Sequence, residues 1–462
     1  MEELSMVRLP QVETEIKPFW EGNTVGGADV VIRIRGEEHP GGSLICDFNQ
    51  DLYGIPCSVD WDSFYMEDEA GELGYTADDE RIQHQLLRSI TAGRDTKGTI
   101  TITYRNKFLP ARPNPVMDMG QEAGGVSGSG ENWMPRLTQE EYELDMKIFK
   151  DGLPDGAKVL WSYGEEHISR TMKKADLQET FYYFGLAKGV ENKNFGYYWF
   201  DREGFDASEI AVWTSEVFLK MADFFRDDNE AYKIFARARQ CRKSGGTALK
   251  RSYSYIYDPD ALPTMTELKF LFPHEMVHNW VTLLDEPFGT CTWYVEGMAE
   301  FYCLVLPWRF GLASREELLE QLNDRAEQYY ENPCAAYPAN ELGDLLFKDK
   351  EATTVPYGRG FFYLMAIDSR IREKTGGSRS LDDVMFAILE RTKAGEVLQN
   401  EAWLQELSKV LDGDVKEEFE AMMKGAVISP IISCFDGADI EIIKKEGISR
   451  RDGKPCVTYE FR

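Results

Sequence analysis

This chain has no long apolar run, and it has fewer basic than acidic residues. No stretch approaches the ~18 consecutive apolar residues of a membrane-spanning helix, which excludes a helical membrane protein. The N-terminus, MEELSMVRLPQ, carries acids where a secretory signal carries bases, and it has no apolar core. We therefore expect a soluble cytoplasmic protein with no membrane partner. The alternative is an exported protein whose signal has been removed.

Basic residues are outnumbered by acidic ones, with 52 Lys and Arg against 80 Asp and Glu, so the formal net charge is −28. A chain this acidic repels a phosphate backbone, which excludes general nucleic-acid binding. We interpret the acidity as a source of solubility, with steering of a substrate as the alternative. Hydrophobic residues still make up 43% of the 462 residues, which is enough for two or three domains with cores of their own.

Paired cysteines are also absent, because the eight cysteines are scattered and form no CxxC motif. In a long chain without an export signal, we expect free thiols in a reducing compartment. Cys291 and Cys303 lie near the candidate metal site described below. We expect both to serve buried packing.

The pattern of the sequence changes along its length. The first 140 or so residues alternate apolar and polar residues, as in ADVVIRIRG and GTITITYRN, and predict an antiparallel β-domain. It ends near a glycine-rich run, GQEAGGVSGSGENWMP, which we interpret as a loop folded against the next domain and not as a free linker. Strand and helix signals mix from about 145 to 260, and helix signals dominate from 264 to 425. The last thirty residues predict a β-hairpin.

The segment HEMVHNW, residues 274 to 280, carries the clearest chemical signal. Residues four apart share one face of a helix, so His274 and His278 can direct both imidazoles at one metal ion. Glu275 then projects beside the metal, where it can take a proton from bound water. The alternative is a pair of surface histidines satisfied by solvent. Two of the chain's five histidines fall in this pentapeptide, which favours the metal site.

A carboxylate follows at a suitable distance. In WYVEGMAEFY, Glu296 lies eighteen residues after His278, and Glu300 lies one helical turn later. His274, His278 and Glu296 form a set of three protein ligands that leaves the fourth zinc position open, as in catalytic zinc sites. Glu300 is suited to accept a hydrogen bond from a ligand imidazole, with an ordinary exposed acid as the alternative. The predicted cofactor is one zinc ion per chain.

A proline, Pro273, stands directly before the first histidine. Proline inside a helix removes a backbone hydrogen bond and clashes with the preceding turn. The metal-binding helix therefore either begins at Pro273 or is kinked there. Both alternatives keep the two histidines on a common face.

The segments HEMVH and WYVEGMAEFY resemble the gluzincin metallopeptidases, in which a glutamate of an E-G-x-x-[ES] helix completes HExxH. Two related families fit, the alanyl-aminopeptidase and leukotriene-hydrolase family and the glycyl-aminopeptidase family. The segment LMAIDSRIREKTGGSRSLDDVMFAI looks like a helix pair of the second family and favours it. The resemblance covers about residues 150 to 425. It implies an α+β multidomain fold with an N-terminal β-domain (1–140), a thermolysin-like catalytic domain (141–300), a helical region (301–430) and a C-terminal hairpin tail (431–462).

The resemblance also singles out Tyr357. The segment TTVPYGRGFFYL is similar to the VPYEKG and YYxKG segments that carry the catalytic tyrosine of these enzymes. It implies that Tyr357 donates a hydrogen bond to the oxyanion formed when water attacks a peptide carbonyl. Without the resemblance, packing would be the default role for one of 22 tyrosines.

Two departures from the families affect the substrate. Their substrate-facing motif, about thirty residues before HExxH, carries a glutamate that binds the free amino group of a peptide. Here Gly245 and Gly246 match its glycines, but the glutamate is missing, and Lys250 and Arg251 follow. We interpret these two bases as a solvated pair, with binding of an acidic group as the alternative. Glu131, in GSGENW, is the candidate to supply the missing carboxylate, with a solvated acid as the alternative.

The second departure concerns the end of the chain. The glycyl-aminopeptidase family usually continues into a PDZ domain, and the thirty or so residues that remain here are too few to form one. We therefore expect no PDZ domain.

The sequence predicts a zinc-dependent peptidase with peptide substrates, and we favour an aminopeptidase. A zinc endopeptidase or a hydrolase of a non-peptide substrate on the same scaffold is the alternative. A non-catalytic binding protein that kept the fold is a third hypothesis. It is disfavoured because all five expected groups are in place: His274, Glu275, His278, Glu296 and Tyr357.

Overall fold

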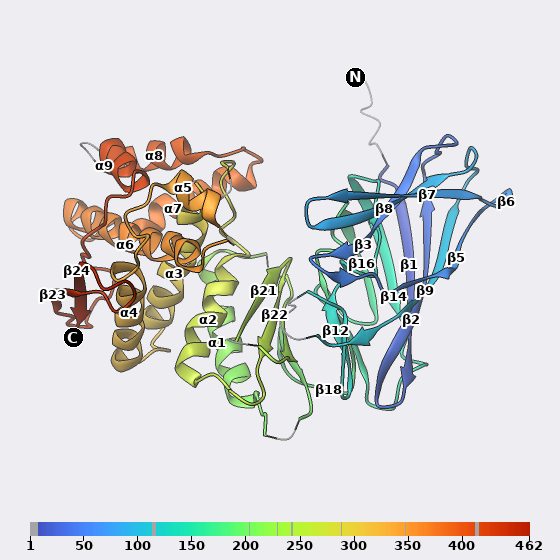
Figure 1. Ribbon diagram of the computed structural model, residues 1–462, viewed down its shortest axis with the longest axis horizontal. Helices are drawn as coiled ribbons and strands as arrows, with labels where there is room; N and C mark the ends of the chain where they lie inside the picture. The colour runs from blue at the N-terminus through green and yellow to red at the C-terminus, as the bar shows by residue number, and fades with distance from the viewer. Residues whose placement is uncertain are drawn as a thin grey trace. The chain divides into compact units, whose positions relative to one another are not determined.

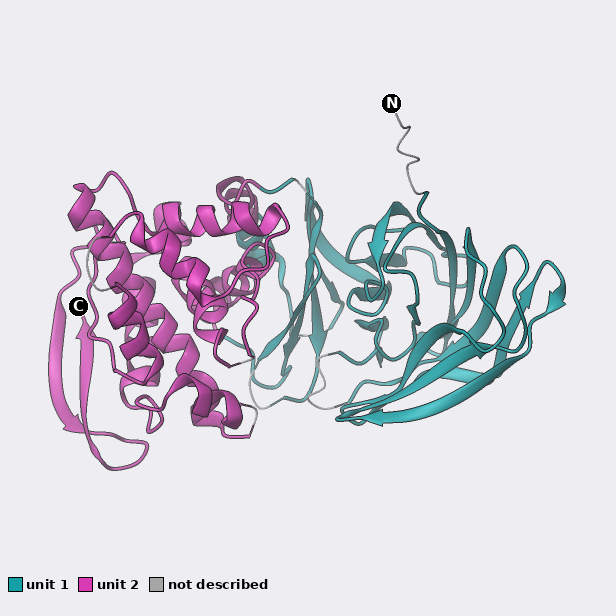
Figure 2. Ribbon diagram, turned by 90° about the horizontal axis from the view of Figure 1, so that it is seen from above, with its two compact units in different colours: residues 1–215, 227–263 teal, residues 216–226, 264–462 magenta. Residues whose placement is uncertain are grey.

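The computed structural model describes residues 8–112, 117–202, 204–228, 230–241, 244–287, 289–346, 348–411 and 415–462. The chain divides into two compact units, which we call unit 1 (residues 1–215 and 227–263) and unit 2 (residues 216–226 and 264–462) (Figure 2). Strands make up most of unit 1 and helices most of unit 2 (Figure 1). The predicted α+β architecture, with β-sheets first and helices after them, is therefore confirmed.

The strands of unit 1 follow one another closely along the chain. They are β1 (Gln11–Glu21), β2 (Thr24–Arg35), β3 (Leu44–Leu52), β4 (Ile55–Pro56), β5 (Val59–Asp68), β6 (Gly71–Glu72), β7 (Tyr75–Ile82), β8 (Gln85–Ala92), β9 (Ile100–Lys107), β10 (Leu109–Pro110), β11 (Gly120–Glu122), β12 (Gly125–Ser129), β13 (Arg136–Leu137), β14 (Glu141–Ile148), β15 (Lys158–Trp161), β16 (His167–Lys173), β17 (Phe181–Gly185), β18 (Ala187–Asn192), β19 (Phe195–Phe200), β20 (Tyr232–Ala238), β21 (Gly245–Leu249) and β22 (Ser252–Tyr257).

These strands form four sheets. A seven-stranded sheet has the order β16-β14-β1-β2-β9-β5-β6, and a smaller one has the order β13-β3-β8-β7, with β4 beside β3. The long strands alternate between buried and less buried residues, as at Val12, Thr14 and Ile16 of β1, because successive side chains point to opposite faces. The inward side chains form one large hydrophobic core. The pairing in these two sheets is antiparallel as predicted, except that β1 runs parallel to β14, and in a third sheet β10 runs parallel to β11.

The glycine-rich run is not the loop that the sequence analysis predicts. It forms β11 and β12, which lie in a sheet of order β10-β11-β12-β17-β15, and β12 is buried throughout. Glycine is needed there because neighbouring backbone leaves no room for a side chain. A Cβ atom on Gly128 would lie 2.1 Å from the carbonyl oxygen of Asp118, and one on Gly130 would lie 1.9 Å from that of Leu177. The many glycines of this run therefore reflect close packing of β12 against neighbouring backbone, and not a loop.

The fourth sheet of unit 1 has the order β18-β19-β20-β22-β21 and is mixed, since β19, β20 and β22 are parallel. Its strands FGYYWF and SYSYIY are buried and rich in aromatic residues, and both lie in the range where strand and helix signals mix. β21 is the last strand of the sheet, and in the described ranges it pairs on one side only, with β22.

Unit 2 is built around helices. The chain reaches it through α1 (Ser208–Phe224), and its other helices are α2 (Met265–Val277), α3 (Thr292–Arg309), α4 (Arg315–Tyr330), α5 (Ala339–Leu345), α6 (Lys350–Thr375), α7 (Leu381–Lys393), α8 (Asn400–Ser408) and α9 (Val415–Met423). The chain ends in a hairpin of β23 (Ile442–Ile448) and β24 (Pro455–Phe461), as the sequence predicts. The hairpin lies against α4 (Figure 1). There the side-chain amide of Asn323 donates a hydrogen bond to the carbonyl of Phe461. None of the described helices is long and apolar enough to cross a membrane.

The segment IDSRIREKTGGSRSLDDV is a structural joint between α6 and α7. α6 ends on Gly376 in the left-handed conformation, with φ of 60°, and α7 begins with a capping box on Ser380. The carboxylate of Asp368, which is fully buried, accepts hydrogen bonds from the backbone N–H of Leu381 at 2.8 Å and from Arg372 at 2.6 Å. The segment thus fixes how the two helices meet.

Candidate metal centre

α2 presents the two histidines from its last turn. The helix begins at Thr264 with a capping box, in which Thr264 and Glu267 satisfy each other's backbone N–H groups. Pro273 therefore lies inside the helix, and the alternative that the helix begins at Pro273 is wrong. His274 follows within the helix, and His278 is its C-cap residue.

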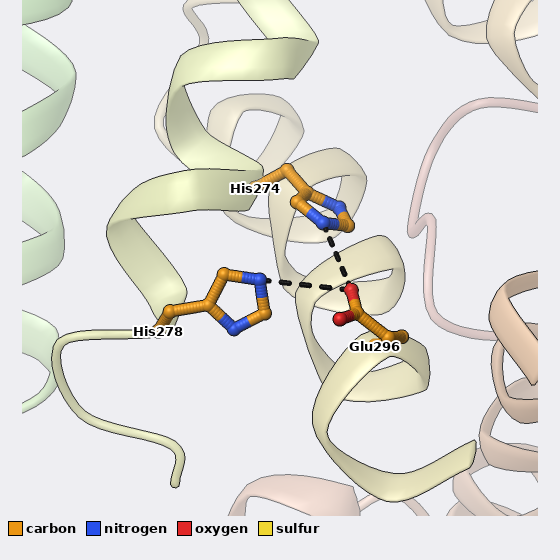
Figure 3. A group of neighbouring side chains, drawn as sticks. All are labelled: His274, His278 and Glu296. Atoms are coloured by element: carbon orange, nitrogen blue, oxygen red, sulfur yellow. Dashed lines mark ion pairs between the residues drawn. The ribbon is translucent and has the colours of Figure 1, made fainter. Parts of the chain in front are cut away.

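The ligand atoms of three side chains converge between α2 and α3 (Figure 3). Nε2 of His274 lies 3.3 Å from Oε2 of Glu296, and Nε2 of His278 lies 3.6 Å from the same oxygen. Two ligands held at ~2.05 Å from a tetrahedral zinc ion are about 3.4 Å apart. The three groups therefore have the chemistry and the spacing to hold a zinc ion.

The buried oxygen of Glu296 supports a cation at this position. Oε2 of Glu296 is shielded from solvent and faces the Nε2 atoms of the two histidines, at 3.3 and 3.6 Å. Burying a carboxylate costs free energy unless it is paired or bound to a metal. A divalent cation between the imidazoles and this oxygen would satisfy it.

Charges in the cluster favour a positive ion. Burial raises the pKa of Glu275 to about 7 and lowers the pKa of His278 to about 4. Burial also opposes the charging of His274, but the neighbouring carboxylates of Glu300 and Glu296 raise its pKa well above the usual value. The cluster thus attracts a positive charge, and a neutral His278 has a free lone pair for a metal.

Glu300 is not an ordinary exposed acid. Its Oε1 lies 3.2 Å from Nδ1 of His274, and its Oε2 accepts a hydrogen bond from Nε of Arg325 at 2.5 Å. Burial would raise the pKa of Glu300, but Arg325 and His274 lower it to about 2. Arg325 was missed by the sequence analysis. It lies on α4, twenty-five residues after Glu300, and no local motif marks it.

Tyr357 lies beside the same cluster. It belongs to α6, and its ring is parallel to that of His274, with 6.0 Å between ring centroids and 11° between planes. The Tyr357 side chain is partly buried, and burial raises its pKa, so the phenol keeps its proton and remains a hydrogen-bond donor.

Two glycines allow α3 and α6 to approach closely. A Cβ atom on Gly297 would lie 2.6 Å from the Cα of Gly360, and one on Gly360 would lie 2.1 Å from the carbonyl oxygen of Trp293. Gly297 follows Glu296 directly, and Gly360 lies one turn after Tyr357. The glycines of EG and YGRG therefore set the spacing between the helix that carries the glutamate and the helix that carries the tyrosine.

Gly297→Ala is expected to lower the free energy of unfolding by about 1–3 kcal/mol, because the added methyl group meets backbone that must move. Urea unfolding followed by circular dichroism would measure the change. Gly447→Ala is the control, since no described heavy atom lies within 4 Å of a Cβ atom at that position in β23. Equal stability of both variants would contradict the close helix contact.

Proteins of known structure resemble this chain in fold but share little of its sequence. The sequence matches no protein-family model and no curated protein. An aminopeptidase N family protein from Idiomarina loihiensis aligns over 94% of this chain and 79% of its own, with a TM-score of 0.67 and 13% identity. An M1 zinc metallopeptidase from Deinococcus radiodurans, solved as a variant with the substrate Tyr-Ser-Ala, aligns over 92% and 96%, with a TM-score of 0.53 and 12% identity.

The fold is that of the M1 aminopeptidases. This family is one of the two that the metal-site motifs resemble, although the downstream segment favours the other, the glycyl-aminopeptidase family. At 13% and 12% identity, the likeness concerns the M1 fold and not the activity.

Three further residues singled out by the sequence lie in unit 1. Gly245 and Gly246 begin the edge strand β21. A Cβ atom on Gly245 would meet no described heavy atom within 4 Å, whereas one on Gly246 would lie 1.9 Å from the carbonyl oxygen of Ser254. Glu131 follows β12 and is partly buried, with its Oε2 accepting a hydrogen bond from Asn49 at 2.6 Å. Burial raises the pKa of Glu131.

The interpretation of Lys250 and Arg251 as a solvated pair is wrong. Nζ of Lys250 contacts the carboxylates of Asp176 and Glu179. Nη1 of Arg251 lies 2.7 Å from Asp227, and the Arg251 side chain is only 10% exposed. Asp176 lies 74 residues before Lys250, and Asp227 lies 24 residues before Arg251, so the sequence alone did not reveal the pairing.

Cys291 and Cys303 are free and buried, as expected for packing. Cys303 has polar contacts as well. Its thiol lies 3.3 Å from the carbonyl oxygen of Glu300, and its Sγ accepts a hydrogen bond from Arg325 at 3.4 Å.

Proposed function

We propose that this protein is a zinc-dependent aminopeptidase. The observation that carries the proposal is the convergence of Nε2 of His274 and Nε2 of His278 on one buried carboxylate oxygen of Glu296, at 3.3 and 3.6 Å. The fold adds support, since a protein of that fold from Deinococcus radiodurans is a zinc metallopeptidase. The downstream likeness to the glycyl-aminopeptidase family concerns the joint between α6 and α7, so it bears on the scaffold more than on the chemistry.

In this proposal His274, His278 and Glu296 hold the zinc ion. Bound there, zinc would polarise the scissile carbonyl and lower the pKa of the attacking water. Glu275 follows His274 directly on α2, and it takes the proton from the water and returns it to the leaving amine. Tyr357 donates its phenolic hydrogen to the oxyanion that forms on the carbonyl.

Peptides are the proposed substrates. The metallopeptidase from Deinococcus radiodurans was solved with the tripeptide Tyr-Ser-Ala. An extended peptide can add to the free edge of a sheet through main-chain hydrogen bonds, and β21, whose residues are half-buried, is the last strand of its sheet. Gly245, at the start of β21, would allow a peptide backbone to approach closely, whereas Gly246 is needed for the close contact with Ser254 of β22.

Glu131 is the proposed partner of the free amino group. It is the candidate carboxylate because the motif around Gly245 and Gly246 lacks its glutamate. An ammonium group would stabilise the ionised form of Glu131, which burial otherwise disfavours. A zinc endopeptidase or a non-peptide hydrolase, the two alternatives on this scaffold, would not need this contact.

Paired peptides, free and N-acetylated, test the aminopeptidase assignment. We expect cleavage of the free peptide only, because acetylation removes the charge that Glu131 would bind. Glu131→Gln is expected to lower kcat/KM for the free peptide by about 10-fold or more, the value of one charged hydrogen bond. Glu72→Gln, at an exposed acid of β6, is the control and should have no effect. Equal cleavage of both peptides would contradict the assignment and favour an endopeptidase.

A further inference from the structure

Arg325, on α4, pairs with the carboxylate of Glu300, which in turn contacts the Nδ1 side of His274, away from the proposed metal. Nδ1 of His274 lies 3.2 Å from Glu300, and the second oxygen of Glu300 accepts from Nε of Arg325 at 2.5 Å. The three residues come from α2, α3 and α4. Only 15% of the Glu300 side chain and 13% of the Arg325 side chain is exposed, so solvent screens this pair weakly.

The guanidinium of Arg325 is fixed at every nitrogen. Beside the contact to Glu300, its Nη1 donates to the side-chain oxygen of Gln321 at 2.8 Å, and its Nη2 donates to Sγ of Cys303 at 3.4 Å. Gln321 lies one turn earlier on α4, so a residue of the same helix fixes the orientation of the guanidinium. Lysine could not make these three contacts at once, because it presents a single ammonium nitrogen on a flexible stem.

This arrangement has a consequence for His274. The carboxylate of Glu300 is placed to accept a hydrogen bond from Nδ1–H of His274, which turns the Nε2 side of the ring toward Glu296 and the proposed metal. Without Arg325, the second oxygen of Glu300 would lose the partner that holds this buried carboxylate in place. The orientation of the imidazole then loses its support.

Arg325 also contacts a group of side chains that could bind a second metal ion. Ligand atoms of His274, Glu300 and Cys303 lie within 4.8 Å of one another and form a second potential metal-binding group. Arg325 contacts both Glu300 and Cys303, so a fixed guanidinium already satisfies that group. The Nε2 side of His274 thus remains the side for the ion.

We propose that Arg325 is a positioning residue of the metal centre, which acts through Glu300 to fix the tautomer and ring orientation of His274. The inference rests on the proposed zinc site but not on peptidase activity. Its effect should therefore appear in zinc affinity, measured by competition with a chelator.

Arg325→Met is expected to weaken zinc binding about 10–100-fold, the usual cost of losing a partner of a metal ligand. Arg309→Met is the matched control. It removes a comparably buried ion pair with Asp382, 2.6 Å long, at the far end of α3. Both variants should lower the thermal stability of the metal-free protein, but Arg309→Met should leave zinc affinity unchanged. A merely structural role for Arg325 would give the two variants the same profile.

A double-mutant cycle tests whether Arg325 acts through Glu300. Glu300→Ala with Arg325→Met should bind zinc as tightly as Glu300→Ala alone, because without the carboxylate Arg325 has no contact that leads to His274. This pair removes both buried charges, so the comparison holds even if Arg325→Met alone does not fold.

An unchanged zinc affinity in Arg325→Met, or a further loss in the double variant, would overturn the inference. A wild-type protein that takes up no zinc would overturn it together with the metal centre. A wild-type protein that binds zinc but cleaves no peptide would refute the proposed function alone.

Discussion

Glu275→Gln is expected to abolish peptide hydrolysis and leave zinc bound. Glutamine keeps the shape of the side chain but cannot accept a proton, and a positioned general base contributes about 10²–10⁴-fold to the rate. We therefore expect kcat to fall by about that factor. Zinc content should not change, because the converging ligand atoms belong to His274, His278 and Glu296. The two measurements are kcat on a free peptide and zinc per chain by atomic emission.

Glu320→Gln serves as the control for that experiment, since Glu320 is an exposed acid on α4. It should match the wild-type protein in both measurements. Full activity in Glu275→Gln would exclude Glu275 as the base. A wild-type protein that binds zinc but hydrolyses nothing would instead favour the non-catalytic binding protein.

The second large effect is expected from His278→Ala, which removes one of the three proposed metal ligands. Structural zinc sites with four ligands bind with an apparent free energy of about 10–16 kcal/mol, or roughly 3 kcal/mol or more per ligand. Losing one ligand should thus weaken zinc binding about 100-fold or more. Chelator competition measures the affinity, and hydrolysis should disappear at zinc concentrations that saturate the wild-type protein.

His167→Ala provides the matched control, because His167 is an exposed histidine on β16 that contacts Asp145. Its loss should leave zinc affinity and activity unchanged. Equal zinc affinity in His278→Ala and the wild-type protein would mean that any bound ion sits elsewhere.

The candidate metal site was predictable because its signals are local. His274 and His278 are four residues apart on one helix, and Glu296 follows on the next, so their spacing in the sequence largely fixes their spacing in the fold. Helix ends fixed by capping residues are also local features, as at Ser380 of α7. The sequence left open whether α2 begins at Pro273 or is kinked there, and the capping box at Thr264 places the start of the helix before Pro273.

Features that depend on contacts distant in sequence were not predictable. Arg325 contacts Glu300 only because α3 and α4 pack together, and no sequence motif near either residue predicts this contact. Lys250 forms an ion pair with Asp176, which lies more than seventy residues earlier in the sequence. The buried strand β12 resembles a loop in composition, since glycine is selected there by neighbouring backbone and not by a turn.

One measurement tests the central claim directly. Crystals of the purified protein grown with zinc should show, in anomalous diffraction collected at the zinc absorption edge, a single strong peak per chain. The account predicts that this peak lies within bonding distance, about 2.0–2.2 Å, of Nε2 of His274, Nε2 of His278 and a carboxylate oxygen of Glu296. No peak at that position, or a peak bound by other residues, would contradict it.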